Sequence, residues 1–244
     1  MVTQASNGIT YGRTLVSTNK IYGGAKHVFV PLPGIKNELV FAPFGGILKN
    51  PPKGGGKLFA GDLFYLKYDD NAENPELYAL KTYLVHSASG SVVNVVRDGF
   101  KHIPFVGDVL TIAPAKIGGQ GEALTVVAVT RTQESGVDVW ALTMSAPPTT
   151  APKKDDVLVD CDSNGNMLVK DINGVAPYDY EFAFAPVANS NIDDDFESAR
   201  YLIAPVLGGR MITKRMSPMP KCVLALNTAK INGWFEVGGA NGFL

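Results

Sequence analysis

The chain has 244 residues, of which 45% are hydrophobic and 18% charged, and its formal net charge is −1. This composition excludes a disordered chain, and the length suffices to bury a sizeable core in one large domain or in about two or three small ones. Nucleic acid is excluded as the main partner, because neutralising a phosphate backbone requires an excess of lysine and arginine. A low charge also suits a surface that partner proteins cover.

No hydrophobic run approaches the roughly 20 residues of a membrane span, and residues 1–10 are polar, unlike a signal peptide. We therefore expect no membrane partner and synthesis in a cytoplasm. The cysteines, Cys161 and Cys222, show no CxxC spacing, and the three histidines are scattered. This pattern predicts free, buried thiols and no zinc site.

Residues 1–57 are rich in loops, and proline and glycine pairs interrupt their short hydrophobic runs. The runs are Lys26–Leu32 and Glu38–Phe44, and Asn50–Gly56 has the composition of a loop or hinge. The hydrophobic side chains of such a segment need burial, but it has few regular strands with which to bury them. We therefore predict an arm that docks on the body or on a neighbouring subunit.

Residues 58–162 contain short runs rich in valine, threonine and aromatic residues between turn residues, which is typical of strands. Six strands are expected: Ala79–Ser87, Ser91–Arg97, Val109–Ala113, Ala123–Arg131, Val137–Ser145 and Val157–Asp160. Six short strands favour a small β-barrel, because closing a sheet on itself removes its exposed edges.

One turn element recurs ahead of a strand, at Asp62, Asp108 and Asp156, each after a small or polar residue. In such a turn we expect a glycine to adopt a positive φ and the aspartate to bond its own backbone. The recurrence has two explanations. It is either an internal repeat or a common turn used three times.

Residues 163–244 are expected to form a β-rich part that carries one short helix. The predicted strands include Tyr178–Val187 and Arg200–Leu207, and the helix is predicted over Pro220–Ala229 because proline suits a first helical turn. The chain is therefore predicted to be mainly β, with a small β-barrel of short strands, a loop-rich N-terminal arm, and this β-rich C-terminal part.

Several clusters suggest chemistry, but each lacks a partner that the chemistry needs. Gly54–Lys57 lacks the strand and helix that flank a phosphate-binding loop. Residues 160–171 place oxygen ligands at alternate positions, as in a calcium loop, but lack its flanking helices. The acidic run 193–197 is typical of a solvated loop. A solvated turn is therefore favoured over a metal site in both acidic segments.

Catalytic patterns are also missing from the sequence. There is no Gly-x-Ser-x-Gly motif, and the positions of His86 and His102 assign no triad. We predict a protein that is not an enzyme, with no catalytic residue, cofactor or metal. A convergent pair of carboxylates for glycoside hydrolysis stays open, because such a pair meets only in the fold.

Aromatic residues cluster around the end of the arm. They have two interpretations, a platform for a carbohydrate or a partner and a hydrophobic core, of which the core is favoured. The residues are Phe41, Phe44, Phe59, Phe64, Tyr65 and Tyr68.

Several motifs over residues 78–240 follow an order known from a viral family. Phe105–Leu110 (FVGDVL), Leu124–Val129 (LTVVAV) and Trp140–Met144 (WALTM) come first, and Leu207–Ile212 (LGGRMI) precedes Arg215–Pro220 (RMSPMP). This order resembles the β-barrel module and the C-terminal end of tailed-phage head-fibre and capsid-decoration (auxiliary capsid) proteins. The match of residues 1–57 is looser and rests on the start of the chain and on the Pro-Leu-Pro at 31–33.

The resemblance implies a structural virion protein that is made in the bacterial host cytoplasm and bound to the capsid surface. Its implied partners are the major capsid protein or other virion proteins. It also implies a homo-oligomer, with a trimer as one option. The family has no catalytic residues to transfer to this chain.

Two segments are the candidates for partner binding. The residues are Phe29, Val30, Leu39, Phe41 and Phe44 of the arm, and Gly208, Gly209, Arg210, Arg215, Pro218 and Pro220 near the C-terminus. The alternative function is a carbohydrate- or host-surface-binding β module of a virion, with the aromatic residues around 59–68 as its platform.

Overall fold

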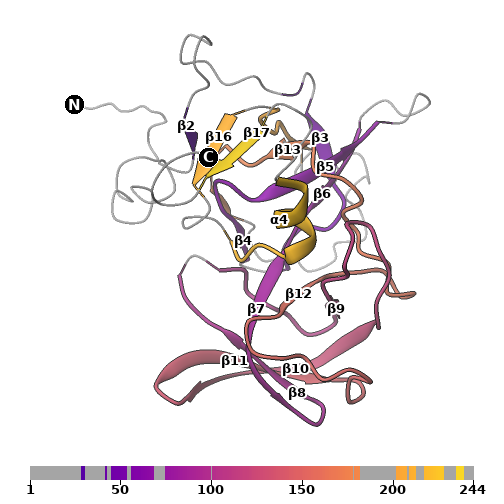
Figure 1. Cartoon of the computed structure of the whole chain (residues 1–244), viewed down its shortest axis with the longest axis vertical. Helices are drawn as coiled ribbons and strands as arrows, with labels where there is room; N and C mark the ends of the chain where they lie inside the picture. The colour runs from indigo at the N-terminus through magenta and orange to yellow at the C-terminus, as the bar shows by residue number, and fades with distance from the viewer. Residues whose placement is uncertain are drawn as a thin grey trace, which may run out of the picture.

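The structure is a computed structural model (Figure 1). It describes residues 29–30, 42, 45–53, 56–68, 75–99, 101–177, 179–181, 202–207, 209–212, 217–227 and 235–238. This part of the chain is mainly β and contains the helix α4 (Lys221–Asn227). The predicted fold class is confirmed, and α4 lies within the segment predicted to be helical.

Antiparallel strands close into a small barrel in the order β10-β11-β8-β7-β12-β9. They are β7 (Thr82–Ser89), β8 (Val92–Val96), β9 (Val109–Ile112), β10 (Leu124–Glu134), β11 (Val137–Met144) and β12 (Val157–Asp160). Each strand coincides with one of the six predicted from the sequence. The prediction of a small β-barrel in this region is therefore confirmed.

Alternating side chains of these strands fill the barrel, as a period of two residues requires. The interior cluster consists of Tyr83, Val85, Val93, Val95, Leu110, Leu124, Val126, Leu142, Met144 and Leu158. The turn between β10 and β11 uses Ser135 (φ 50°) and Gly136 (φ 79°). Two successive positive φ angles are what a two-residue type I′ hairpin requires.

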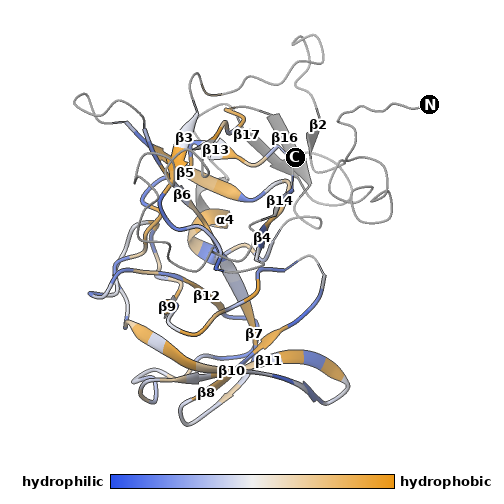
Figure 2. Ribbon diagram, turned by 180° about the vertical axis from the view of Figure 1, so that it is seen from behind, coloured by the Kyte–Doolittle hydropathy of each residue, from blue (hydrophilic) through white to orange (hydrophobic). Residues whose placement is uncertain are grey.

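A second sheet lies against one end of the barrel and has the strand order β13-β5-β6-β3-β15 (Figures 1 and 2). Its strands are β3 (Gly46–Leu48), β5 (Leu63–Lys67), β6 (Glu76–Ala79), β13 (Gly174–Val175) and β15 (Leu202–Ile203). One hydrophobic cluster joins β5, the outer side of β12 and helix α4 through Leu63, Val159 and Val223. The barrel, the sheet and the helix therefore share a core.

Two smaller sheets complete the described part. β4 (Lys57–Leu58) pairs with β14 (Tyr180–Glu181). β16 (Gly209–Ile212) lies between β17 (Phe235–Gly238) and β2 (Phe29–Val30).

The sheets divide the chain differently from the three sequence-based segments 1–57, 58–162 and 163–244. β3 belongs to the predicted arm, yet it pairs with β6 and β15, and its Leu48 is buried. The barrel strands begin at Thr82, so β5 and β6 lie in the second sheet instead. Short strands from distant parts of the chain combine here because none of them forms a sheet alone.

The recurring aspartate turn has the geometry that the sequence predicts. A side-chain oxygen of each aspartate accepts a bond from the backbone N–H three residues earlier, at 2.6, 2.8 and 2.8 Å for Asp62, Asp108 and Asp156. The residue before each aspartate has a positive φ, and these residues are Gly61, Gly107 and Asp155. Asp155 takes this conformation in place of glycine, which aspartate tolerates better than most residues.

We predict that Gly165→Ala destabilises the fold strongly. Gly165 has a φ of +82°, and a Cβ at this position would overlap the carbonyl oxygen of Gly121. Gly90 is the matched control, because its φ is +59° but nothing lies within 4 Å of an added Cβ. Gly90→Ala should lose about 1 kcal/mol from the left-handed backbone alone. Gly165→Ala should lose at least about 2 kcal/mol more, because carbonyl and methyl cannot share the space. Urea unfolding measures both, and equal losses would contradict the overlap.

Candidate docking surface

Four of the predicted partner-binding residues meet in one small sheet (Figure 1). β2 supplies Phe29 and Val30, which pair antiparallel with Met211 and Arg210 of β16. Gly209 starts the same strand, and β17 pairs with it in parallel along its other edge. Parts of the arm and of the C-terminal segment, which the sequence suggests as two separate docking segments, thus pair in one sheet. We call the sheet β17-β16-β2 the docking sheet.

The remaining candidates divide into two groups. Leu39, Phe41, Phe44, Gly208 and Arg215 lie outside the described residues. Pro218 is half-buried, whereas Pro220 is buried and its carbonyl accepts bonds from the Val223 and Leu224 N–H groups at the start of α4. Pro220 therefore serves the helix rather than an exposed docking surface.

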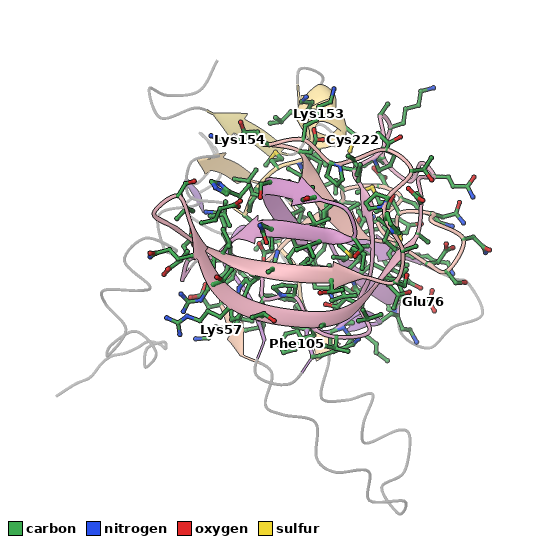
Figure 3. All side chains as sticks on the ribbon, turned by 90° about the horizontal axis from the view of Figure 1, so that it is seen from below. Lys57, Glu76, Phe105, Lys153, Lys154 and Cys222 are labelled. Carbon is green, nitrogen blue, oxygen red and sulfur yellow. The ribbon has the colours of Figure 1, made fainter. Side chains whose placement is uncertain are left out.

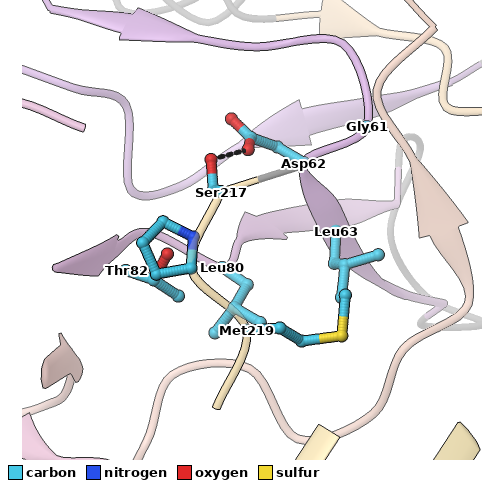
Figure 4. A pocket seen from close by; sticks show the side chains of 8 residues that line it. Gly61, Asp62, Leu63, Leu80, Thr82, Ser217 and Met219 are labelled. Atoms are coloured by element: carbon cyan, nitrogen blue, oxygen red, sulfur yellow. Dashed lines mark hydrogen bonds between the residues drawn. The ribbon is translucent and has the colours of Figure 1, made fainter. Parts of the chain in front are cut away.

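A buried carboxylate fastens the segment between β16 and α4 to the body. Asp62 Oδ1 accepts a hydrogen bond from Ser217 Oγ at 2.5 Å (Figure 4). Asp62 Oδ2 lies 2.8 Å from His102 Nε2. The side chains of Asp62 and His102 are each 1% exposed. We call these three residues the Asp62 junction. It connects the turn before β5, the connection between β8 and β9, and the segment that leads to α4.

The hydrogen bonds of His102 define its tautomer. The Thr82 N–H donates to Nδ1 at 2.9 Å, so Nδ1 acts as the acceptor and Nε2 carries the proton that faces Asp62. The Ser217 hydroxyl contacts the carboxylate rather than the imidazole. A serine nucleophile needs a free imidazole nitrogen as its base, and this arrangement supplies none. The three residue types of a catalytic triad are therefore arranged here as a structural junction.

A pocket of about 10 Å³ lies beside the Asp62 junction, between Leu63, Leu80 and Met219 (Figure 4). The Thr82 side chain also lines it, and its Oγ1 has no hydrogen-bond partner among the described residues. A volume of this size corresponds to about one water molecule. The pocket is too small for an organic substrate.

A buried ion pair lies at the end of the barrel that faces the second sheet. Lys81 Nζ lies 2.8 Å from Asp160 Oδ2, and both side chains are at least nine-tenths buried. Burial raises the pKa of Asp160, and the nearby Lys81 charge opposes that rise. A second lysine, Lys53, reaches Asp108 at 3.1 Å.

These contacts change the interpretation of the Asn50–Gly56 loop. Asn50 exchanges two hydrogen bonds of 2.8 Å with the backbone of Ala79, and Lys53 also donates to the Val106 carbonyl at 3.2 Å. The loop has the composition of a hinge, but the described residues 50–53 are fixed to the body by side chains. Gly54 and Gly55 lie outside the described residues.

The acidic turn at Asp162 bonds itself. Asp162 Oδ1 accepts hydrogen bonds from the backbone N–H groups of Asn164 and Asn166 at 2.8 and 2.9 Å, and Oδ2 accepts one from the Asn166 side-chain amide. The bond from the Asn166 side chain, together with the backbone bonds, lowers the pKa of Asp162. Among the described residues, no group of three or more histidine, cysteine or acidic side chains is placed to hold a metal ion. The acidic run 193–197 lies outside the described residues.

Both cysteines are free and buried, as predicted. Burial raises the pKa of Cys161 to about 12 and also raises the pKa of Cys222. Both side chains are therefore thiols, not thiolates, near neutral pH.

The aromatic cluster is partly core. Phe59 and Phe64 are buried, and Tyr65 stacks on Tyr78 with ring centroids 6.1 Å apart. Tyr68 is 61% exposed. Phe41 and Phe44 lie outside the described residues.

Comparison of the chain with family models, curated proteins and solved structures gave no match. No helix in the described part is long and apolar enough to cross a membrane.

The sequence missed the Asp62 junction as a unit. The Gly-Asp turn singled out Asp62, but nothing in the spacing of His102 or Ser217 links them to it. His102 and Ser217 stand 40 and 155 positions from Asp62 in the sequence, respectively.

We predict that Asp62→Asn destabilises the fold by about 2–4 kcal/mol, because an amide presents its NH₂ to donors that need an acceptor. Asp62 takes bonds from the Phe59 N–H, His102 and Ser217. Ser217→Ala removes one donor and should cost about 1 kcal/mol. Chemical unfolding of the two variants checks the order of the effects. If the junction is unimportant for stability, Asp62→Asn will lower the free energy of unfolding by no more than Ser217→Ala does.

Replacing one member of the buried ion pair should be costly, whereas replacing both should not. Lys81→Met leaves Asp160 without its counter-charge and is expected to lose about 3–5 kcal/mol of stability, whereas the double variant with Asp160→Leu should recover most of that loss.

The stability of the Lys81→Met variant should also depend on pH. Burial raises the folded-state pKa of Asp160, so stability is greatest below the ordinary aspartate pKa and falls as pH rises through the folded-state value. Unfolding at pH 4 and pH 7 measures this, and a pH-independent loss would contradict it.

Proposed function

We propose that this chain is a non-enzymatic structural protein of a virion. It binds the capsid surface as a head-decoration, auxiliary or head-fibre protein and acts through protein–protein contacts. Its partners are the major capsid protein or other virion proteins, and further copies of the chain itself. The protein is made in the bacterial host cytoplasm and ends on the capsid surface.

The observation that carries the proposal is the docking sheet. The Phe29–Val30 segment is a candidate because its arm has hydrophobic side chains that need burial but few regular strands. Gly209–Arg210 is a candidate because of the resemblance to the viral family. These two independent criteria select segments that pair with each other in β2 and β16. A three-stranded sheet ends in backbone edges, and the addition of a strand to such an edge is a common mode of protein recognition.

Three further observations support a binding role over catalysis. The low charge of the chain suits a covered surface. The pocket beside Asp62 holds about one water molecule, and the histidine next to it has no free nitrogen. The Ser217–Pro220 segment is fixed to the body at Asp62 and at the start of α4 by hydrogen bonds, so Ser217 has a structural partner rather than a catalytic one.

The alternative is a carbohydrate- or host-surface-binding module, and Tyr68 is the observation in its favour. At 61% exposure it presents an aromatic face to solvent, as sugar platforms do. Tyr65 and Tyr78 instead stack on each other, and Phe64 is buried, so the platform is smaller than the sequence suggests. A glycan array separates the two functions, because specific glycan binding that Tyr68→Ala abolishes would favour the alternative.

The proposal predicts that deleting residues 1–41 abolishes capsid binding and leaves the body folded. The deletion removes β2 but keeps β3, whose Leu48 is part of the core. A deletion through residue 57 would be uninformative, because it would also remove β3 and its pairing with β6.

Co-sedimentation with capsids assembled in the bacterial host provides the measurement. The full chain should sediment with the capsids, and the shortened chain should stay in the supernatant. The control is the urea unfolding curve of the shortened chain, which should match that of the full chain. Equal sedimentation of a folded, shortened chain would argue against the docking sheet, and a full chain that never sediments would overturn the proposed function.

A further inference from the structure

The long strand β10 leaves the barrel partway along its length. Leu124 and Thr125 pair with β9, and Val126 exchanges backbone bonds with residues 107 and 108. The register with β11 then shifts between Val126 and Ala128, at a β-bulge or similar irregularity. From there to Glu134 it pairs with β11 on one side, and no described strand pairs with its other side. We call residues 127–134 the β10 edge; β10 is labelled in Figure 1, and Figure 3 views the molecule from the barrel end.

The register defines which backbone groups point away from β11. The Arg97 N–H donates to the Asp138 carbonyl, so the backbone groups of Asp138 face β8. Its partner in β10, Gln133, is therefore in a non-hydrogen-bonded pair and faces outward. Because this pattern alternates along an antiparallel strand, the N–H and C=O groups of Val129 and Arg131 also face outward. Those of Thr130 and Thr132 bond to β11.

Natural sheets protect such edges with prolines, lysines, bulges or very short strands. Residues 128–134 contain no proline, and their pairing with β11 is regular. The exposed edge is also longer than the four-residue strands β9 and β12, which the closed barrel covers. A long, regular and open edge is a template for an additional strand.

The side chains around the β10 edge indicate the chemistry of that strand. Arg131 is exposed, and no hydrogen bond or ion pair joins it to any described residue. Nearby charged side chains have partners: Arg97 lies 3.0 Å from Asp138, and Glu134 accepts hydrogen bonds from Ser87 Oγ and Asn94 Nδ2.

Exposed hydrophobic side chains lie at the other end of the edge. Val127 is 50% exposed and Val106 is 59% exposed. They are close in space because the Gly107 N–H donates to the Val126 carbonyl. An incoming strand is therefore complementary if it carries an acidic side chain opposite Arg131 and an apolar one beside these valines.

We propose that the β10 edge is a second docking surface, which receives an extended strand of a neighbouring capsid subunit. The inference rests on the proposed function and deepens it by naming a contact and its chemistry. Outward backbone groups at Val129, Arg131 and Gln133 bond the incoming strand, and Arg131 selects an acidic residue on it. This surface lies on the barrel and is separate from the docking sheet at the other end of the molecule (Figure 1).

Amide hydrogen exchange tests the proposal residue by residue. In the free chain, the Val129, Arg131 and Gln133 amides should exchange fast, whereas Thr130 and Thr132 are protected by β11. On capsids assembled in the bacterial host, the three outward amides should slow by roughly tenfold or more, as in a newly paired strand. The two inward amides are internal controls.

The other outcomes separate the alternatives. Unchanged exchange of the outward amides in a capsid-bound chain would overturn this inference and leave the proposed function intact. A chain that does not bind capsids would overturn the proposed function and this inference with it. Outward amides that become protected in the free chain as its concentration rises would identify a second copy as the occupant, which also overturns the proposal.

A charge test addresses the recognition of the acidic residue. Arg131→Glu should weaken capsid binding by roughly two- to fivefold relative to Arg131→Lys, which is the size expected for one exposed ion pair. Arg131→Pro should weaken it further, because proline removes an outward N–H that has no partner among the described residues. Urea unfolding of each variant shows whether the barrel is intact. Equal affinities of three folded variants would contradict the proposal.

Discussion

The carboxylate of Asp62 is the interaction on which the arrangement of the rest depends. It lies almost completely out of water, where an unpaired charge would be too costly to keep, and it is held there by donors from three separate parts of the chain. The turn before β5, the connection that carries His102 and the segment that carries Ser217 therefore have fixed positions relative to one another. Helix α4 and the barrel pack against the second sheet near the Asp62 junction, through the shared core that contains Leu63, Val159 and Val223.

At the polar end of the barrel, too, a buried charged group is stabilised by a partner from another part of the chain. Lys81 immediately precedes β7 and Asp160 ends β12, and these two strands are paired in the barrel. Each buried charge is tolerable because the other is present. Asn50 and Lys53 extend this polar layer into the loop before β4. The loop, whose composition suggests a flexible hinge, is thereby attached to the barrel through specific side chains. A binding protein gains from such attachments, since a rigid surface loses less entropy when it binds a partner.

The two proposed docking surfaces differ in origin. The docking sheet is assembled from segments far apart in the sequence, so its formation depends on the completed fold. The β10 edge belongs to one local hairpin that extends beyond the barrel. Because they lie at opposite ends of the molecule, a chain that used both would bridge two neighbours in an assembly (Figure 1). Binding at both ends would raise the overall affinity through effective concentration, even if each contact were weak by itself.

The sequence by itself determined the mainly β class, the six barrel strands and the three aspartate turns, because alternation and turn chemistry are local properties of neighbouring residues. It also determined that the cysteines are free and buried. Only the tertiary structure decided that β3 belongs to the body, that Asp62, His102 and Ser217 meet, and that Phe29 lies beside Met211. These outcomes depend on pairing between distant strands and on hydrogen bonds that close across long stretches of chain. Residue spacing along one sequence carries no signal for such contacts, because it is the packing of the whole chain that brings the partners together.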